Sequence, residues 1–292
     1  MENKIQILAP AKINLTLEVL GKRDDGYHNI QTVMQAIDLY DIVTLSLNDS
    51  NMVTISCNYE GVPCDDRNIC AKSAYRFFEY CKIEPKGIHI DIDKKIPTQA
   101  GLAGGSSDGA AVVFGLNELL NTGLSYEQMH QICEKVGADV PFCLYGGTML
   151  ATEIGTTLKK LSPFSCENIV ICKPDFVSVS TAEAYKKVDA LNPHISYTDK
   201  MVNAIDNNDI TNLSKSISND FDIALQIPEV RDIKAEMLKY KAIGAEMSGS
   251  GSAVYGIFVS ENDAKTCFDN LKTVYKEVFL CKTINHGCIV KA

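Results

Sequence analysis

The first hundred residues alternate between apolar and polar positions in several short runs. From residue 13 to residue 19 every second side chain is apolar, which predicts a strand with one buried and one polar face. Similar runs lie at 43–47, 53–57 and 88–92. Because parallel strands that are buried on both faces read as continuous apolar runs, these patterns favour a mainly antiparallel sheet.

Apolar residues at helical spacing predict helices in both halves of the chain. They lie at residues 71–81, 107–120, 126–136, 181–188, 200–207, 228–240 and 262–274. Continuous apolar runs at 169–172 and 253–259 predict strands in the second half, so the fold class is α+β. The pattern changes near 146–147 and again at 161–163, and we place a boundary there between domains at 1–155 and 156–292.

The charge balance is acidic and excludes several classes of protein. The chain has 28 Lys and Arg against 37 Asp and Glu, and no basic run offers the footprint that nucleic acid requires. No apolar stretch reaches the roughly 18 residues that span a bilayer, and the first residues lack the apolar core of a signal peptide. We therefore expect a cytoplasmic protein that binds neither nucleic acid nor membrane.

The eleven cysteines form no C-x-x-C pair, and the five histidines do not lie at ligand spacing beside them. We interpret most of the cysteines as small buried hydrophobic residues that stay reduced. The metal ligands and the oligomeric state are not specified by the sequence, although Ser107 is one candidate ligand.

The most informative segment is rich in glycine and reads KIPTQAGLAGGSSDGAA from residue 95 to residue 111. It follows a predicted strand and opens into a predicted helix, so the glycines would let the backbone bend closely while Ser106 or Ser107 caps the helix. The exposed N–H groups of such a helix end attract anions, above all phosphate. The segment is neither a Walker A motif nor G-x-G-x-x-G. On these residues alone, phosphate binding and a plain strand-to-helix connection both stay open.

Two further segments add to this picture. A second small-residue loop, Ser248-Gly249-Ser250-Gly251, precedes the predicted strand at 253–259, although such loops are also common linkers. Near the N-terminus, Lys12 and Asn14 share the polar face of the first strand, where a lone lysine is ordinarily just solvated.

Five segments in this order resemble the GHMP kinase superfamily. They are PAKINL at 10–15, GYH at 26–28 followed by Gln31-Thr32, the glycine-rich segment from 96 to 107, GADVPF at 137–142, and SGSG at 248–251. The resemblance covers residues 9–258 and is greatest for the branch that acts on a cytidyl diphosphate sugar alcohol.

This resemblance implies a two-domain fold, with an ATP-binding N-terminal domain of ribosomal-protein-S5-like type, an α+β C-terminal domain and an active site in the cleft between them. It implies phosphorylation, by ATP and Mg²⁺, of the 2-hydroxyl of 4-diphosphocytidyl-2-C-methyl-D-erythritol in non-mevalonate isoprenoid biosynthesis. The implied partners are therefore ATP and this small-molecule substrate.

Site residues follow from the same resemblance. Asp139 would be the catalytic base and Lys12 its charged partner. The ATP phosphates would be held by Pro97, Gly101, Leu102, Ala103, Gly104, Gly105, Ser106 and Ser107. The loop Ser248-Gly249-Ser250-Gly251 would be a second glycine-rich element beside the ligands. The superfamily branch usually has glycine where this chain has Ala103, so the backbone there must tolerate a Cβ.

On the substrate side, the resemblance implies that Asn14 holds the substrate and that Tyr27 and His28 read the cytosine. Tyr185 would stack on the other face of the base, at a position where phenylalanine is frequent.

Two alternatives stay open. The chain could be a kinase for another small alcohol, homoserine or mevalonate, but Gly26-Tyr27-His28 argues against this because those substrates have no cytosine. It could also be a nucleotide-binding module without catalysis, although a pure binder has no need for both Lys12 and Asp139.

Overall fold

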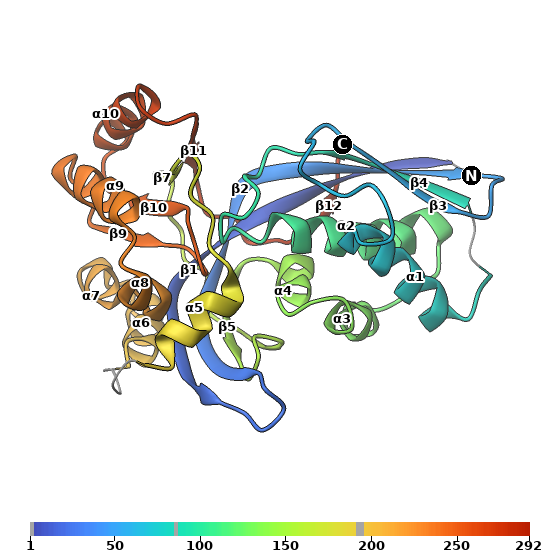
Figure 1. The fold of residues 1–292 in the computed structure, drawn as a ribbon, viewed down its shortest axis with the longest axis horizontal. Helices are drawn as coiled ribbons and strands as arrows, with labels where there is room; N and C mark the ends of the chain where they lie inside the picture. Colours follow the sequence, from blue (N-terminus) through green and yellow to red (C-terminus); the bar gives the residue numbers. More distant parts are fainter. Residues whose placement is uncertain (1–2, 85–86, 191–195) are drawn as a thin grey trace.

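A computed structural model describes residues 3–84, 87–190 and 196–292 of the chain. Two β-sheets form its framework; the two longest strands belong to the larger sheet and also pack against the smaller one (Figure 1). The larger sheet has eight strands and the smaller has four.

The larger sheet is built on a hairpin of β1 (Lys4–Lys22) and β2 (His28–Asn48). β4 (Gly87–Asp93) pairs with β2, and β3 (Val53–Cys57) completes that edge. The remaining strands are β5 (Thr148–Thr152), β6 (Thr157–Lys160), β8 (Ser218–Asn219) and β12 (Ile289–Val290). The prediction of a mainly antiparallel sheet is confirmed; in the described ranges the parallel pairs are β3 with β4 and β1 with β8.

Four helices pack on this sheet (Figure 1). They are α1 (Ile69–Cys81), α2 (Gly104–Leu120), α3 (Tyr126–Glu134) and α4 (Val140–Tyr145). The predicted serine cap of α2 is wrong. The helix begins at Gly104, its N-cap is Ala103 in the left-handed region, and no side chain caps it. The hydroxyl of Ser107 instead donates to the carbonyl of Pro10 at 2.7 Å and so attaches α2 to β1.

The smaller sheet is antiparallel in the order β11-β7-β10-β9. Its strands are β7 (Ile169–Lys173), β9 (Gly244–Met247), β10 (Val254–Ile257) and β11 (Glu277–Cys281). The helices of this half are α5 (Thr181–Val188), α6 (Thr198–Asp206), α7 (Ile210–Ser216), α8 (Asp220–Leu225), α9 (Pro228–Lys239) and α10 (Glu261–Lys272).

The predicted domain boundary at residue 155 falls in the turn between β5 and β6, which pair with each other. Two strands from the second half, β8 and β12, pair with β1. The boundary at residue 155 stays a prediction.

Seven of the eleven cysteines are buried and all eleven are free thiols, which confirms their interpretation as mostly small core residues. Within the described ranges, no helix combines the length and the apolar character that crossing a bilayer requires.

Candidate active site

A cleft of about 680 Å³ lies where the two halves of the molecule meet. It is lined by the polar face of β1, by the glycine-rich segment before α2, by the start of α4, by Tyr185 on α5 and by residues 249–251. The fold therefore brings together the segments that the sequence analysis singled out.

Lys12 and Asp139 are neighbours in this cleft. Lys12 Nζ lies 3.8 Å from Asp139 Oδ2; the lysine side chain is 4 % exposed and the aspartate side chain 39 %. Asp139 is the N-cap residue of α4, yet its carboxylate makes no capping hydrogen bond. The Asp139 carboxylate therefore lies in the cleft beside Lys12, where it can meet a ligand.

The glycine-rich segment is fixed to β1 and to the second small-residue loop. Lys12 N–H donates to the carbonyl of Leu102 at 3.1 Å. The hydroxyl of Ser248 donates to the carbonyl of Gly101 at 2.9 Å, and a Cβ on Gly101 would lie 1.9 Å from the carbonyl oxygen of Ser248. Glycine is thus required at position 101 by close packing as well as by a φ of +74°.

The second loop, Ser248-Gly249-Ser250-Gly251, is held from beneath by Asn219. Its side-chain amide donates to the carbonyls of Met247 and Gly249 at 2.7 and 2.8 Å. The hydroxyls of Ser250 and Thr181 lie 3.0 Å apart and join this loop to the start of α5.

The start of α2 has the properties of an anion site. The helix is 17 residues long, no side chain caps it, and Gly104, Gly105 and Ser106 line the cleft. The first N–H groups of a helix have no partner within the helix, and the helix dipole adds partial positive charge there. This end can therefore receive phosphate oxygens.

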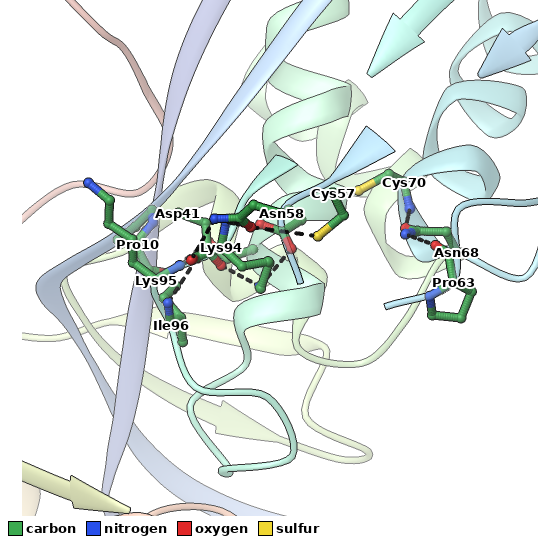
Figure 2. A network of polar contacts seen from close by, with 12 residues as sticks. Pro10, Asp41, Cys57, Asn58, Pro63, Asn68, Cys70, Lys94, Lys95 and Ile96 are labelled. Atoms are coloured by element: carbon green, nitrogen blue, oxygen red, sulfur yellow. Dashed lines mark hydrogen bonds and ion pairs between the residues drawn. The ribbon is translucent and has the colours of Figure 1, made fainter. Parts of the chain in front are cut away.

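Beneath this end lies a buried cluster of charged residues formed by Asp41, Lys94 and Asp108. Figure 2 shows Lys94 beside Asp41, whose Oδ1 accepts N–H bonds from Lys95 and Ile96 at 2.6 and 2.9 Å. Lys94 Nζ donates to Asp41 and also to Asp108 Oδ2, the latter at 2.8 Å. The cluster thereby fixes the segment that leads from β4 into the glycine-rich loop.

The electrostatics of the cluster are set by burial. Burial and the neighbouring Asp41 charge raise the pKa of Asp108 well above its ordinary value, against the attraction of Lys94. Burial alone would lower the pKa of Lys94, but the two carboxylates outweigh it and raise that pKa. Asp108 is therefore an anchor for Lys94 rather than an exposed negative charge facing a phosphate.

Of the aromatic residues predicted to read a base, two are in contact. The rings of His28 and Tyr185 stack with centroids 4.4 Å apart, and His28 Nε2 lies 2.8 Å from Asp189 Oδ1. Burial, with the Asp139 charge, raises the pKa of Tyr185 to about 12. Tyr27 is 62 % exposed and does not line the cleft. The structure thus pairs Tyr185, which lines the cleft, with His28; neither His28 nor Tyr27 is among the lining residues.

Several residues with evident roles were missed by the sequence reasoning. Asp41, Asp189 and Asn219 contribute through contacts with residues distant in sequence, and no local pattern marks them. Thr32 stood in a quoted motif but received no role.

Magnesium in kinases is bound mostly by nucleotide phosphates and water, with one or two protein carboxylates. Throughout the described ranges, no three His, Cys, Asp or Glu side chains cluster as a metal site. Asp139 and Asp108 are the acidic residues among those that line the cleft. Asp108 is buried and bonded to Lys94, so the Asp139 carboxylate, 39 % exposed, is the one that would fit a magnesium ion arriving with the nucleotide.

A second, partly buried charged cluster lies beside the small-residue loop and leads to a pH-dependent prediction. Lys234 donates to Asp222 and, at 2.7 Å, to Glu246, which lies two residues before Ser248. Burial, followed by the hydrogen bond and charge of Asp222, raises the pKa of Glu246 from 4.5 to about 8. Between these values the folded protein holds a proton that the unfolded chain has lost, so the free energy of unfolding falls as pH rises.

We expect Glu246→Gln to remove this fall, because glutamine cannot ionise. Urea unfolding from about pH 5 to about pH 8 measures this free energy. The stability of the variant relative to the wild-type protein should rise toward pH 8. Glu236→Gln is the control, because Glu236 lies on the same helix as Lys234 but forms its ion pair with Lys239. Parallel pH curves for the wild-type protein and Glu246→Gln would contradict the prediction.

Comparison with known proteins identifies the family. The model described as "GHMP kinases N terminal domain" matches residues 68–147, and that described as "GHMP kinases C terminal" matches residues 201–277. Together they match more than half of the chain. The chain therefore belongs to the GHMP kinase family and is a small-molecule kinase with the two-domain fold of that family.

Similar curated proteins agree on one activity. A Clostridium tetani protein named 4-diphosphocytidyl-2-C-methyl-D-erythritol kinase is 40 % identical over 96 % of this chain and 100 % of its own length. A Thermoanaerobacter pseudethanolicus protein of the same name is 44 % identical over 97 % of this chain and 98 % of its own.

Solved structures show the same fold. A crystal structure of 4-(cytidine 5'-diphospho)-2C-methyl-D-erythritol kinase has a TM-score of 0.80 at 27 % identity and covers 96 % of this chain and 99 % of its own. Homoserine kinase from Cytophaga hutchinsonii has a TM-score of 0.81 at 23 % identity, covering 100 % and 98 %. This second likeness shows the fold alone.

Proposed function

We propose that the chain transfers the γ-phosphoryl group of ATP to the 2-hydroxyl of 4-diphosphocytidyl-2-C-methyl-D-erythritol, in non-mevalonate isoprenoid biosynthesis. The observation that carries the proposal is the pairing of Lys12 Nζ with Asp139 Oδ2, 3.8 Å apart in a cleft that the uncapped start of α2 also lines. The names of the similar curated proteins support the choice of substrate.

Phosphoryl transfer depends mainly on in-line positioning and on neutralising phosphate charge. The backbone from Pro97 to Ser107 would bind the ATP phosphates, and the Lys12 ammonium would face the charge on the transferring group. Asp139 would accept the hydroxyl proton as the substrate oxygen bonds to the γ-phosphorus. The bond from that phosphorus to the bridging oxygen then breaks, and ADP leaves with its electron pair. A bound magnesium ion would supply further charge neutralisation on the phosphates.

The cytidine end of the substrate would lie toward His28, Tyr27 and Tyr185. Stacking of a base on an aromatic side chain contributes about 1–3 kcal/mol in single-stranded nucleic-acid binders. The hydrogen bond of His28 to Asp189 holds its imidazole in place and leaves Nδ1 for the base. Selectivity for cytosine would come from such polar contacts at the edge of the ring. The cytoplasmic location expected from the sequence stays a prediction.

The proposal is tested by measuring ADP release with the cytidyl substrate, homoserine and mevalonate offered separately at equal concentration. We expect turnover with the cytidyl substrate to exceed the other two by at least about 10³-fold, because a site built for polar recognition rejects analogues that lack the recognised groups by about 10⁴-fold or more. Faster turnover of homoserine or mevalonate would contradict the substrate assignment, and absence of turnover with all three would contradict the assignment as a kinase of these alcohols.

A further inference from the structure

We propose that Thr32 on β2 is a positioning residue of this kinase, which fixes the side-chain amide of Asn14 so that Asn14 in turn holds Lys12. The inference rests on the proposed function for its kinetic consequence. Three short contacts carry it. Lys12 Nζ donates to Asn14 Oδ1 at 2.5 Å, Asn14 Nδ2 donates to Thr32 Oγ1 at 2.8 Å, and Thr32 Oγ1 donates to the carbonyl of Thr16 at 2.5 Å.

The donor and acceptor in each of these three hydrogen bonds are fixed by the groups at the two ends of the series. An ammonium group can only donate, so the Asn14 atom that faces Lys12 must be the oxygen. A backbone carbonyl can only accept, so the single proton of the Thr32 hydroxyl must point at Thr16. The lone pair of that hydroxyl is then what receives Asn14 Nδ2. No other assignment satisfies all four groups, and turning the Asn14 amide over would place an N–H group against the ammonium.

Burial restricts the Asn14 amide to this orientation. Lys12 is 3 % exposed, Asn14 2 % and Thr32 1 %. An unmade hydrogen bond in such surroundings is costly because water cannot replace it. The amide of Asn14 is therefore held in one orientation rather than exchanging between two.

A β-bulge provides the accepting carbonyl. The register of β1 against β2 shifts between Asn14 and Thr16, so that Thr16 lies opposite Val33 instead of continuing the ladder. The Thr16 hydroxyl receives bonds from Val33 N–H and from Thr198 on α6 at 3.1 and 2.9 Å. Bulges beside active sites commonly redirect side chains in this way.

The backbone of Asn14 is also held by a residue of the smaller sheet. The hydroxyl of Tyr255, on β10 of the smaller sheet, donates to the carbonyl of Asn14 at 2.9 Å. Both halves of the molecule therefore fix the backbone position of Asn14. The hydrogen bonds from Lys12 through Asn14 to Thr32 then fix the orientation of its side-chain amide.

The consequence for the substrate concerns Asn14. Its oxygen is used by Lys12 and one N–H by Thr32, while its second N–H has no hydrogen-bond partner among residues 3–84, 87–190 and 196–292. Asn14 lines the cleft, so it presents a donor alone. It would therefore bind an acceptor atom of the substrate, such as the oxygen of a hydroxyl whose proton is directed to Asp139.

The experiment compares Thr32→Val, which keeps the shape but removes the hydroxyl, with Thr32→Ser, which keeps the hydroxyl. We expect Thr32→Val to lower kcat by about 10²-fold, since displacement of a catalytic group by about 1 Å has that effect, with KM for ATP unchanged. Thr32→Ser should restore most of the turnover. Thr44→Val is the matched control, because Thr44 is another buried threonine of β2 and its hydroxyl accepts a hydrogen bond from Gln6, away from the cleft.

A crystal structure of Thr32→Val without ligands provides a second reading that does not depend on the substrate. We expect Lys12 Nζ to leave Asn14 Oδ1 and to move relative to Asp139. An unmoved lysine, or a kcat equal to that of Thr44→Val, would overturn the inference even if the cytidyl substrate is turned over. A uniform loss in Thr32→Val and Thr32→Ser alike would also overturn it, because a shared loss would mark a packing role.

Discussion

Replacing Asp139 with asparagine is expected to lower kcat by about 10²–10⁴-fold, the contribution of a general base, while ATP still binds. Asparagine keeps the shape of the side chain but cannot accept the hydroxyl proton. Because the Asp139 carboxylate makes no capping bond to α4, the exchange should not disturb the helix. Transfer to the cytidyl substrate and equilibrium binding of ATP are the two measurements.

Asp269→Asn is a suitable control, since Asp269 lies on α10 in an exposed ion pair with Lys265. It should leave both quantities unchanged. Near-normal turnover of Asp139→Asn would exclude Asp139 as the base. Loss of ATP binding in the same variant would indicate that the Asp139 charge helps to hold the nucleotide and its metal ion.

The second large effect is expected for Gly101→Ala, which should destabilise the fold by about 2–5 kcal/mol. Its new methyl group would lie 1.9 Å from the carbonyl oxygen of Ser248, in a backbone with a φ of +74°. To relieve this steric clash, the glycine-rich segment and the Ser248–Gly251 loop would have to move apart. The affinity for ATP should therefore fall together with the free energy of unfolding, which urea titration measures.

Gly105→Ala is the matched control for stability. A Cβ at Gly105 would meet nothing closer than Ile69 Cγ2 at 4.0 Å, and the residue is helical. Alanine should be neutral there or stabilising by up to about 1 kcal/mol. Equal urea midpoints for the two variants would show that the contact between Gly101 and Ser248 does not constrain the loops.

The alternation of apolar and polar residues predicted several strands, including residues 13–19 of β1, but it missed most of β2. The alternation at 53–57 and 88–92 predicted β3 and β4 well. For β2 it revealed only 43–47, because residues 32–37 are all buried and mix apolar with polar side chains. Met34 and Ala36 pack in one core cluster and Val33 and Ile37 in another, so both faces of that stretch carry apolar residues and no alternation is visible.

The start of α2 shows how tertiary contacts override local preference. Glycine is a poor helix former, so the sequence placed the start of the helix at Ser107. In the structure a Cβ at Gly104 would lie 3.0 Å from Lys94 Nζ. Glycine is therefore what allows the first turn of the helix to approach the buried Asp41, Lys94 and Asp108 cluster, and no local signal reports that requirement.

The candidate site could be predicted in part. The motifs selected Lys12 and Asp139, and the fold places them 3.8 Å apart although 127 positions separate them in the sequence. Residues that act through others, such as Thr32 and Asp41, were not found, since each depends on a register or contact that only the folded chain defines. Sequence motifs identify the residues expected to contact ligands more readily than the residues that hold those side chains in place.

The central claim is that the main chain from Pro97 to Ser107 holds the triphosphate beside Lys12 and Asp139. A crystal structure with a non-hydrolysable ATP analogue and the cytidyl substrate measures this directly. The account predicts the γ-phosphate at the start of α2 beside Lys12, and the 2-hydroxyl within hydrogen-bond reach of Asp139 and about 3–3.5 Å from the phosphorus. A triphosphate bound away from this loop, or a hydroxyl beyond the reach of Asp139, would contradict it.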